Sequence, residues 1–178
     1  MKRLFAVRKP EADESLAGYF VRVTEANMVV SQRWMLDAIE EESGIPLPSL
    51  LDLLTNSDAL AAFERIASLP AGVLTERGFH AYDSSEGTSL RLGSYHLLAR
   101  HWMLKNDQVC PQCLVESPYL RQAWKLGHAP VCARHRSELL AACPKCQTQL
   151  RWTRTSVCHC GRCGFDLRRC NPPSVPLE

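Results

Sequence analysis

Four pairs of metal-ligand residues in the second half of the chain constrain its fold more than any other feature. Each pair is a cysteine followed, three positions later, by a cysteine or a histidine. Eighteen residues separate the first and second pairs, and thirteen separate the third and fourth. So short a segment builds an apolar core with difficulty, and bound metal can replace that core.

Paired in sequence order, these residues predict two structural zinc ions. Zinc takes four nitrogen or sulfur ligands in a tetrahedron, and four protein ligands leave no open position for catalysis. The turn inside each pair points backbone N–H groups at the thiolates, and Pro111 and Pro144 favour that turn. Gly161 and Gly164 give backbone freedom to the last pair. One expected site is Cys110, Cys113, Cys132 and His135, and the other is Cys143, Cys146, Cys160 and Cys163.

Three alternatives stay open at this point. The cysteines are reduced, unligated thiols, or the pairs of the two sites interleave, or Cys158 replaces Cys160 as a ligand. The last choice would leave four residues inside the closing pair instead of two. We favour sequential pairing, which needs only short loops, and Cys160, which keeps the spacing. Cys170 is spare, and we expect a reduced thiol there.

The length of 178 residues suits one ordinary domain or two small ones. No apolar run approaches eighteen residues, so we expect no membrane span. Residues 4–7 are too short for a signal-peptide core. We therefore expect a cytoplasmic protein, where thiols stay reduced and paired cysteines act as metal ligands instead of forming disulfides.

Charge is distributed unevenly along the chain. Residues 1–109 hold eleven basic and fifteen acidic residues, a net charge of −4, whereas residues 110–178 hold ten and four, a net charge of +6. Seven ligand thiolates and two zinc ions would reduce the second value to about +3. This charge permits contact with a nucleic-acid backbone but does not identify it.

The first half shows the periodicity of short helices. Leu16, Phe20 and Val23 form one apolar stripe over residues 14–27, with Asp13 as the expected cap. Further helices are expected after Ser31, over 49–54, after Asn56 and over 70–77. The residues expected to face inward in the second and fourth helices are Trp34, Met35, Ala38 and Ile39, and Leu60, Phe63 and Ala67.

Beyond Gly78 we expect a loop over 79–93, with a short strand possible at residues 90–92, and a last helix over 94–105. Short helices joined by tight turns are what a helix-turn-helix needs. Such a motif would place a helix in a DNA major groove. The alternative is a helical bundle whose stripes form only a core, which the run Glu40, Glu41 and Glu42 favours because these acids would repel phosphate.

A strip of another kind separates the first two ligand pairs: Tyr119, Leu120, Arg121, Trp124 and Leu126. It predicts a packing strip that supports the zinc site, with contact between Arg121 and a partner's phosphate or carboxylate as the alternative. Arginines are also frequent on the zinc modules, where we expect a solvated face or a partner contact. The candidates for partner or phosphate contact are Arg121, Arg134, Arg136, Arg151 and Arg154.

We therefore expect a mostly α-helical protein with small zinc-bound α+β modules. A helix-turn-helix-like helical domain comes first, and two tandem zinc-finger modules follow it. The expected parts are an N-terminal arm (1–13), the helical domain (14–105), zinc modules (106–142 and 143–170) and a tail (171–178). For the arm, a solvated tail and docking on the second half or on a partner both stay open.

Taken together, the motifs of the chain resemble those of the TniQ family. The resemblance covers nearly the whole sequence and rests on more than the ligand spacing. The segments that carry it are Pro10, Glu14-Ser15-Leu16 and Arg22, Cys110-Pro-x-Cys113-Leu114, Arg121-x-x-Trp124, Cys132-x-x-His135 with Leu139-Leu140, Cys143-Pro-x-Cys146, and Cys160-x-x-Cys163-Gly164-x-Asp166-Leu167-Arg168.

That resemblance implies a non-enzymatic role in target-site selection during bacterial DNA transposition. TniQ proteins connect a target-recognising component to an AAA+ transposition regulator (TnsC-like), which recruits the transposase. The chain resembles the short form found in type V CRISPR-associated transposons, where an RNA-guided effector complex recognises the target. From the residues alone, a stand-alone zinc-containing DNA-binding regulator is the main alternative and a zinc nuclease the third.

Overall fold

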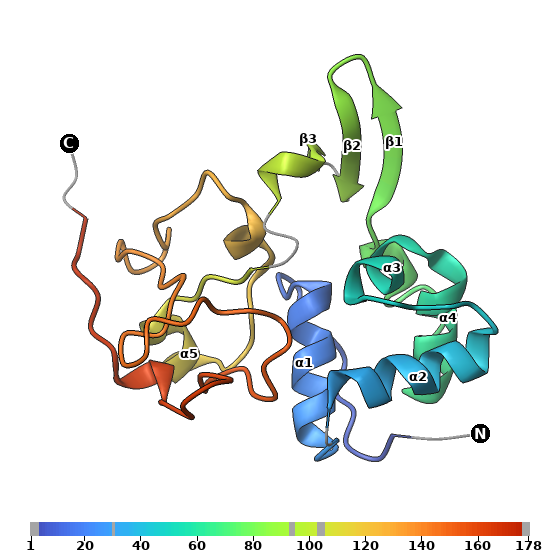
Figure 1. The fold of residues 1–178 in the computed structure, drawn as a ribbon, viewed down its shortest axis with the longest axis horizontal. Helices are drawn as coiled ribbons and strands as arrows, with labels where there is room; N and C mark the ends of the chain where they lie inside the picture. The colour runs from blue at the N-terminus through green and yellow to red at the C-terminus, as the bar shows by residue number, and fades with distance from the viewer. Residues whose placement is uncertain (1–3, 30, 93–94, 103–105, 176–178) are drawn as a thin grey trace. The chain divides into compact units, whose positions relative to one another are not determined.

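The computed structural model describes residues 4–29, 31–92, 95–102 and 106–175. Its chain divides into two compact units. Unit 1 consists of residues 1–12 and 23–101, and unit 2 consists of residues 13–22 and 102–178. Figure 1 shows that helices dominate the early part of the chain and that loops and short turns dominate the later part. Within the described ranges, no helix has the length and apolar character needed to cross a membrane.

Three helices form the core of unit 1: α2 (Gln32–Ser43), α3 (Leu50–Thr55) and α4 (Ser57–Ile66), with α2 and α3 both packed against α4. Ser31 caps α2, as predicted, by accepting a hydrogen bond from the Trp34 N–H, and Gly44 ends it at a left-handed φ of 71°. Large apolar side chains meet between these helices: Met35, Leu36, Ile39, Leu47, Leu50, Leu53, Leu60, Phe63 and Ile66 are all buried.

Two expectations about α2 need correction. The Trp34 side chain does not face the core but is 42% exposed. The acids at the end of α2 are not a uniformly exposed run either. Glu40 forms an ion pair with Arg33 at 2.9 Å, and Glu42 forms one with Arg65, also at 2.9 Å. Neighbouring arginines therefore offset part of the charge that would repel phosphate.

The segment that follows α4 is fixed by a buried carboxylate. Glu64 accepts hydrogen bonds from the N–H groups of Gly72, Leu74 and Thr75 at 2.6 to 3.2 Å. Because these N–H groups are satisfied by a side chain, the segment follows turns up to a 3-10 helix at Thr75–Arg77. The helix expected over 70–77 is thus limited to its last three residues.

The loop and final helix expected between residues 79 and 105 are wrong over most of their described residues, but the short strand allowed at residues 90–92 is confirmed as part of a longer strand. Instead, β1 (His80–Ser84), β2 (Gly87–Leu92) and β3 (Tyr95–Leu98) form an antiparallel sheet in the order β1-β2-β3 (Figure 1). A 3-10 turn at Ala99–His101 follows. Residues 94 and 103–105 of the expected helix lie outside the described residues. The apolar residues within 95–98 fit the period of a helix as well as that of a strand, and pairing with β2 favours the strand.

The N-terminal arm is bound within unit 1 at its start. The N–H groups of Phe5 and Ala6 donate to Asn27 Oδ1 at 2.8 and 3.0 Å, and the Leu4 N–H donates to the Ile66 carbonyl at 3.2 Å. The arm is therefore not simply a solvated tail, although the Phe5 side chain is exposed.

Unit 2 begins with the first residues of α1 (Leu16–Ala26), a helix that continues into unit 1. Ser15, not Asp13, caps this helix, because its Oγ accepts the Gly18 N–H at 3.0 Å. The Ser15 N–H in turn donates to the Leu120 carbonyl at 2.8 Å, and Gly18 leaves no room for a Cβ beside Leu120. Residues 13–22 thus pack on the strip that precedes the second ligand pair.

The second, third and fourth ligand pairs each lie on a small hairpin. The three hairpins share the same backbone pattern. In each hairpin, the N–H four residues after the first ligand donates to the carbonyl of that ligand, at 2.7 to 3.0 Å. The donors have left-handed backbones, with φ of 52° at Arg136, 57° at Gln147 and 66° at Gly164. Flanking residues close each hairpin through an isolated antiparallel bridge, namely Val131–Glu138, Ala142–Gln149 and His159–Asp166.

The first ligand pair uses a helix instead. Cys110 precedes α5 (Pro111–Glu116), which begins with proline and contains Cys113. Apolar residues beneath α5 and the hairpins form one buried cluster, which includes Val109, Leu114, Leu120, Trp124, Leu150, Val157 and Leu167.

The described residues thus form a mostly helical protein with one small sheet, followed by tandem zinc modules, and this confirms the predicted fold class. The two units do not coincide with the expected parts: residues 13–22 belong with the zinc-binding half, residues 1–12 belong with unit 1, and unit 2 resumes at residue 102. The predicted module boundaries near residue 142 remain a prediction.

Candidate metal centres

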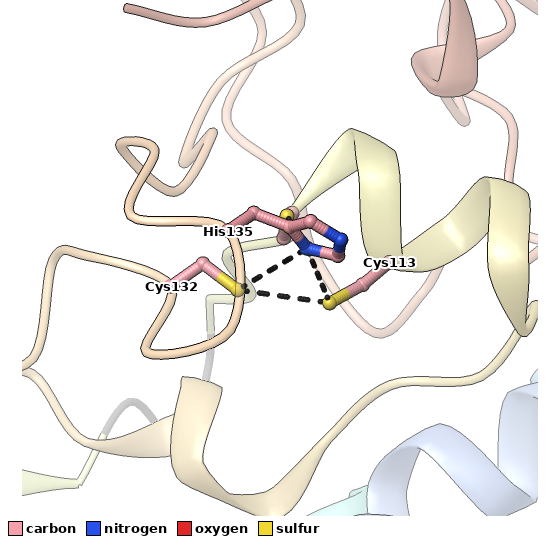
Figure 2. A group of neighbouring side chains, drawn as sticks. Cys113, Cys132 and His135 are labelled. Carbon is pink, nitrogen blue, oxygen red and sulfur yellow. Dashed lines mark hydrogen bonds between the residues drawn. The ribbon is translucent and has the colours of Figure 1, made fainter. Parts of the chain in front are cut away.

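The first ligand set converges in unit 2 as the spacing predicted. One ligand atom from each of Cys110, Cys113, Cys132 and His135 lies within 4.8 Å of all the others. His135 Nδ1 lies 3.2 Å from Cys113 Sγ and 3.8 Å from Cys132 Sγ, and these two sulfurs are 3.6 Å apart. Figure 2 shows these three side chains pointing toward one another.

These separations fit a zinc tetrahedron. With Zn–S near 2.3 Å and Zn–N near 2.0 Å, tetrahedral angles give S···S of about 3.8 Å and S···N of about 3.5 Å. Four of the six separations in the first set lie between 3.2 and 3.8 Å, and all six are within 4.8 Å. The donor set, three cysteines and a histidine, is also one that structural zinc uses.

Glu116, at the end of α5, fixes the orientation of the His135 ring. Nε2 of the ring lies 3.0 Å from Glu116 Oε1, so Nε2–H donates to the carboxylate and Nδ1 is left as the ligand atom. The hydrogen bond to His135 holds the pKa of Glu116 below its usual value. Arg134 Nη2 lies 3.1 Å from the other carboxylate oxygen, Glu116 Oε2. Glu116 was not among the predicted site residues, although it lies three residues after Cys113.

The second set, Cys143, Cys146, Cys160 and Cys163, converges in the same way, with all four sulfurs within 4.8 Å of one another. Cys143 Sγ lies 3.7 Å from Cys163 Sγ, and Cys146 Sγ lies 3.6 Å from Cys160 Sγ. Cys160, and not Cys158, is the residue whose sulfur converges with the other three, so the structure favours Cys160 as the ligand.

Backbone and hydroxyl donors favour the thiolate form of one cysteine in each set, Cys132 and Cys146. Burial raises the pKa of Cys132, but the N–H groups of His135 and Arg134 outweigh that effect and lower it to about 7. Thr148, through its hydroxyl and its N–H, lowers the pKa of Cys146 to about 6. Since zinc binds thiolates, each set has one cysteine that is prepared for metal near neutral pH. Another ligand of each set is shifted the other way: burial raises the pKa of Cys113, and although the Phe165 N–H lowers the pKa of Cys163, burial with the neighbouring thiols outweighs it and raises that pKa to about 11. The two sets therefore fit two structural zinc ions, which would hold the hairpins in place.

The motif residues outside the ligand sets turn out to support the zinc-binding unit. Glu14 is buried and accepts two hydrogen bonds from Arg22, at 2.6 and 2.8 Å. The Arg121 guanidinium lies over the rings of Tyr119 and Trp124, at 4.7 and 5.2 Å from their centroids. The packing interpretation of the strip between the first two ligand pairs is therefore the one that the structure favours.

The five candidate contact arginines occupy different environments. Arg121, with a side chain 11% exposed, lies 3.4 Å from Asp13. Arg154 was expected on the surface but is only 3% exposed. It forms a buried cluster with Asp107 and Lys125, in which Asp107 accepts from both cations, from Arg154 at 2.5 Å. The other three candidates, Arg134, Arg136 and Arg151, are exposed.

The fold and the sites define a class: a small helical protein with two closed structural zinc sites and a modest cationic surface. A comparison with protein families narrows this class, because the TniQ family model matches residues 6–139, about three quarters of the chain. The chain belongs to the TniQ family, a transposition-associated adaptor family. A search of curated proteins found no match. The matched region contains the first ligand set, and the second set follows it.

Proposed function

We propose that this chain is a non-enzymatic adaptor for target-site selection in DNA transposition. In this role it links an AAA+ regulator to a complex that recognises the target, which the family resemblance suggests is an RNA-guided type V CRISPR effector. The proposal places it with the DNA in the bacterial cytoplasm. Family membership across residues 6–139 is the observation that carries the proposal.

The zinc sites support a structural role over a catalytic one. Each set supplies four protein ligands, so a bound zinc would have no open position for a water or a substrate. The buried motif residues point the same way, because Glu14, Arg22 and Trp124 are engaged within unit 2. What remains available to partners is the outer surface of the units.

Capture of the purified regulator by the immobilised chain tests the proposal. We expect capture with ATP and little with ADP, since the ATP form of an AAA+ protein is the assembled one. The variant Cys146→Ser removes a ligand of the second site. It should reduce both the zinc content of the chain and its capture of the regulator. Failure of the wild-type chain to capture any regulator with ATP would contradict the proposal.

A gel-shift measurement on random duplex separates the adaptor from a stand-alone DNA-binding regulator. The adaptor should bind duplex weakly, whereas the stand-alone regulator should bind it tightly and lose affinity steeply as salt rises. Tight duplex binding together with no capture of the regulator would favour the alternative. The same capture assay, repeated with the effector–guide RNA complex as bait, tests the link to RNA-guided targeting.

A further inference from the structure

A hollow of about 360 Å³ lies on the second zinc module, within unit 2. Arg151, Arg154 and Arg162 line it, together with the hydroxyl residues Thr148 and Thr153. Among the described residues, none that lines the hollow is acidic. The hollow therefore combines cationic forks with neutral hydrogen-bonding groups.

Arg154, which lines the hollow, belongs to a buried cluster of two cations and one carboxylate. Arg154 donates to Asp107 Oδ2 at 2.5 Å, and Lys125 binds Oδ1 of the same carboxylate. One carboxylate thus serves two cations, and all three residues are at least nine-tenths buried. The cluster thus carries a formal charge of +1, and this charge favours an anion in the hollow that Arg154 lines.

Two exposed arginines stand at the same hollow. Arg162 donates from Nη1 to Thr148 Oγ1 at 3.2 Å, which holds its guanidinium near that hydroxyl. Within the described part of the chain, neither Arg151 nor Arg162 forms an ion pair with a carboxylate. A Cβ on Gly161 would lie 2.9 Å from Arg154 Cβ, so the absence of a side chain lets the hairpin of the fourth ligand pair lie directly on Arg154.

We propose that this hollow binds a phosphate group of a nucleic-acid backbone. Arginine guanidinium groups and the Thr153 hydroxyl suit an anion that presents several oxygens in a tetrahedron. Such contacts position a protein on nucleic acid without selecting a sequence. The hollow would thus add a backbone contact to the proposed adaptor, although the inference itself rests only on the residues of unit 2.

The competing explanation is that the arginines balance the second metal site. Four thiolates and one zinc ion carry a formal charge of about −2, and Cys160 also lines the hollow. If this were their whole role, replacing the two exposed arginines would weaken zinc binding and leave nucleic-acid affinity unchanged.

The double variant Arg151→Gln/Arg162→Gln tests the proposal, with Arg169→Gln as the matched control on the same module. Arg169 is exposed and does not line the hollow. Fluorescence anisotropy with a labelled 20-base-pair duplex and a 20-nucleotide single strand gives Kd at 50 and 200 mM salt. We expect the double variant to raise Kd about tenfold at low salt and to reduce the salt slope by about one phosphate. The control should change Kd less than twofold.

Several outcomes overturn the proposal: an equal loss in Arg169→Gln, an unchanged Kd in the double variant, or loss of zinc alone. Titration with inorganic phosphate tests whether the hollow binds the free anion instead of a nucleic-acid backbone. Saturation by free phosphate without binding of either oligonucleotide also overturns the proposal. An acidic peptide bound with the same variant dependence would assign the hollow to a protein instead.

A measurement on the wild-type chain avoids the risk that the double variant misfolds. Arginine Nε–Hε signals of Arg151 and Arg162 should shift when the oligonucleotide is added, and that of Arg169 should not. No shift at the two hollow arginines overturns the proposal. The double variant should still capture the AAA+ regulator. Such retained capture would show that the phosphate proposal can fail without the adaptor role failing.

Discussion

Asp107→Asn tests whether the buried ion cluster stabilises unit 2. Asp107 is 1% exposed and its carboxylate is the shared partner of Lys125 and Arg154. The amide would keep the shape but remove the charge, leaving two cations buried without their counter-ion. Breaking a buried pair in this way costs about 3–5 kcal/mol. For a unit of roughly 60–100 residues, 3 kcal/mol corresponds to a fall in Tm of about 12–24 °C.

The assay is thermal unfolding followed by circular dichroism at a fixed free zinc concentration, because metal loss otherwise mixes with unfolding. Asp166→Asn is the matched control. Its ion pair with Arg168 is more exposed, and asparagine still caps the 3-10 turn that begins at Leu167, so we expect a cost below about 1 kcal/mol. A loss for Asp107→Asn no larger than that of the control would refute the reasoning.

The pH dependence provides a second check. Burial alone raises the pKa of Asp107, but Lys125 and Arg154 together lower it. A carboxyl with a depressed folded pKa contributes stability that is present above its unfolded pKa, about 3.9, and is lost as pH falls through the folded pKa. The difference in Tm between wild type and Asp107→Asn should therefore be constant from pH 5 to 8 and shrink below about pH 4.

Three further predictions concern the metal sites. Cys146→Ser should lower zinc from two ions per chain to about one by elemental analysis, and a folded variant that keeps two would contradict the ligand assignment. Glu116→Ala should weaken zinc at the first site about 10–100-fold in chelator competition, because His135 loses its orienting partner, and an unchanged affinity would contradict this. Gly161→Ala should cost about 1–3 kcal/mol in thermal unfolding because its Cβ meets Arg154, and an unchanged Tm would show that the contact relaxes freely.

The spacing of the ligands predicted the metal sites well because a tetrahedral ion imposes local rules. A spacing of two residues between ligands forms the same turn at each pair. That spacing favoured Cys160 over Cys158 as the partner of Cys163. The same local logic predicted Ser31 and Gly44 at the ends of α2. Glu116, in contrast, is defined only by where α5 places it relative to His135, and a single glutamate leaves no pattern in the sequence.

The sheet of unit 1 could not be predicted for a related reason. All five residues of β1 are exposed, so no apolar alternation marks the strand. Tyr95 and Leu98 are spaced as on a helix but belong to β3, whose conformation is fixed by pairing with β2. The burial of Arg154 depends likewise on Asp107, forty-seven residues earlier in the chain. Long-range partners of this kind decide what local periodicity leaves open.

The inclusion of residues 13–22 in unit 2 has a consequence for how the protein is made. Asp13 accepts a hydrogen bond from Tyr119, which lies 106 residues later. At roughly 5–20 residues per second, the ribosome delivers that partner about 5–20 s after Asp13 itself. During that interval the side chains of Phe20 and Val21 lack the rest of unit 2, so they cannot be fully buried. The zinc-binding half produced without these residues would lack the segment that covers Leu120, so zinc alone should not suffice to make it a stable fragment.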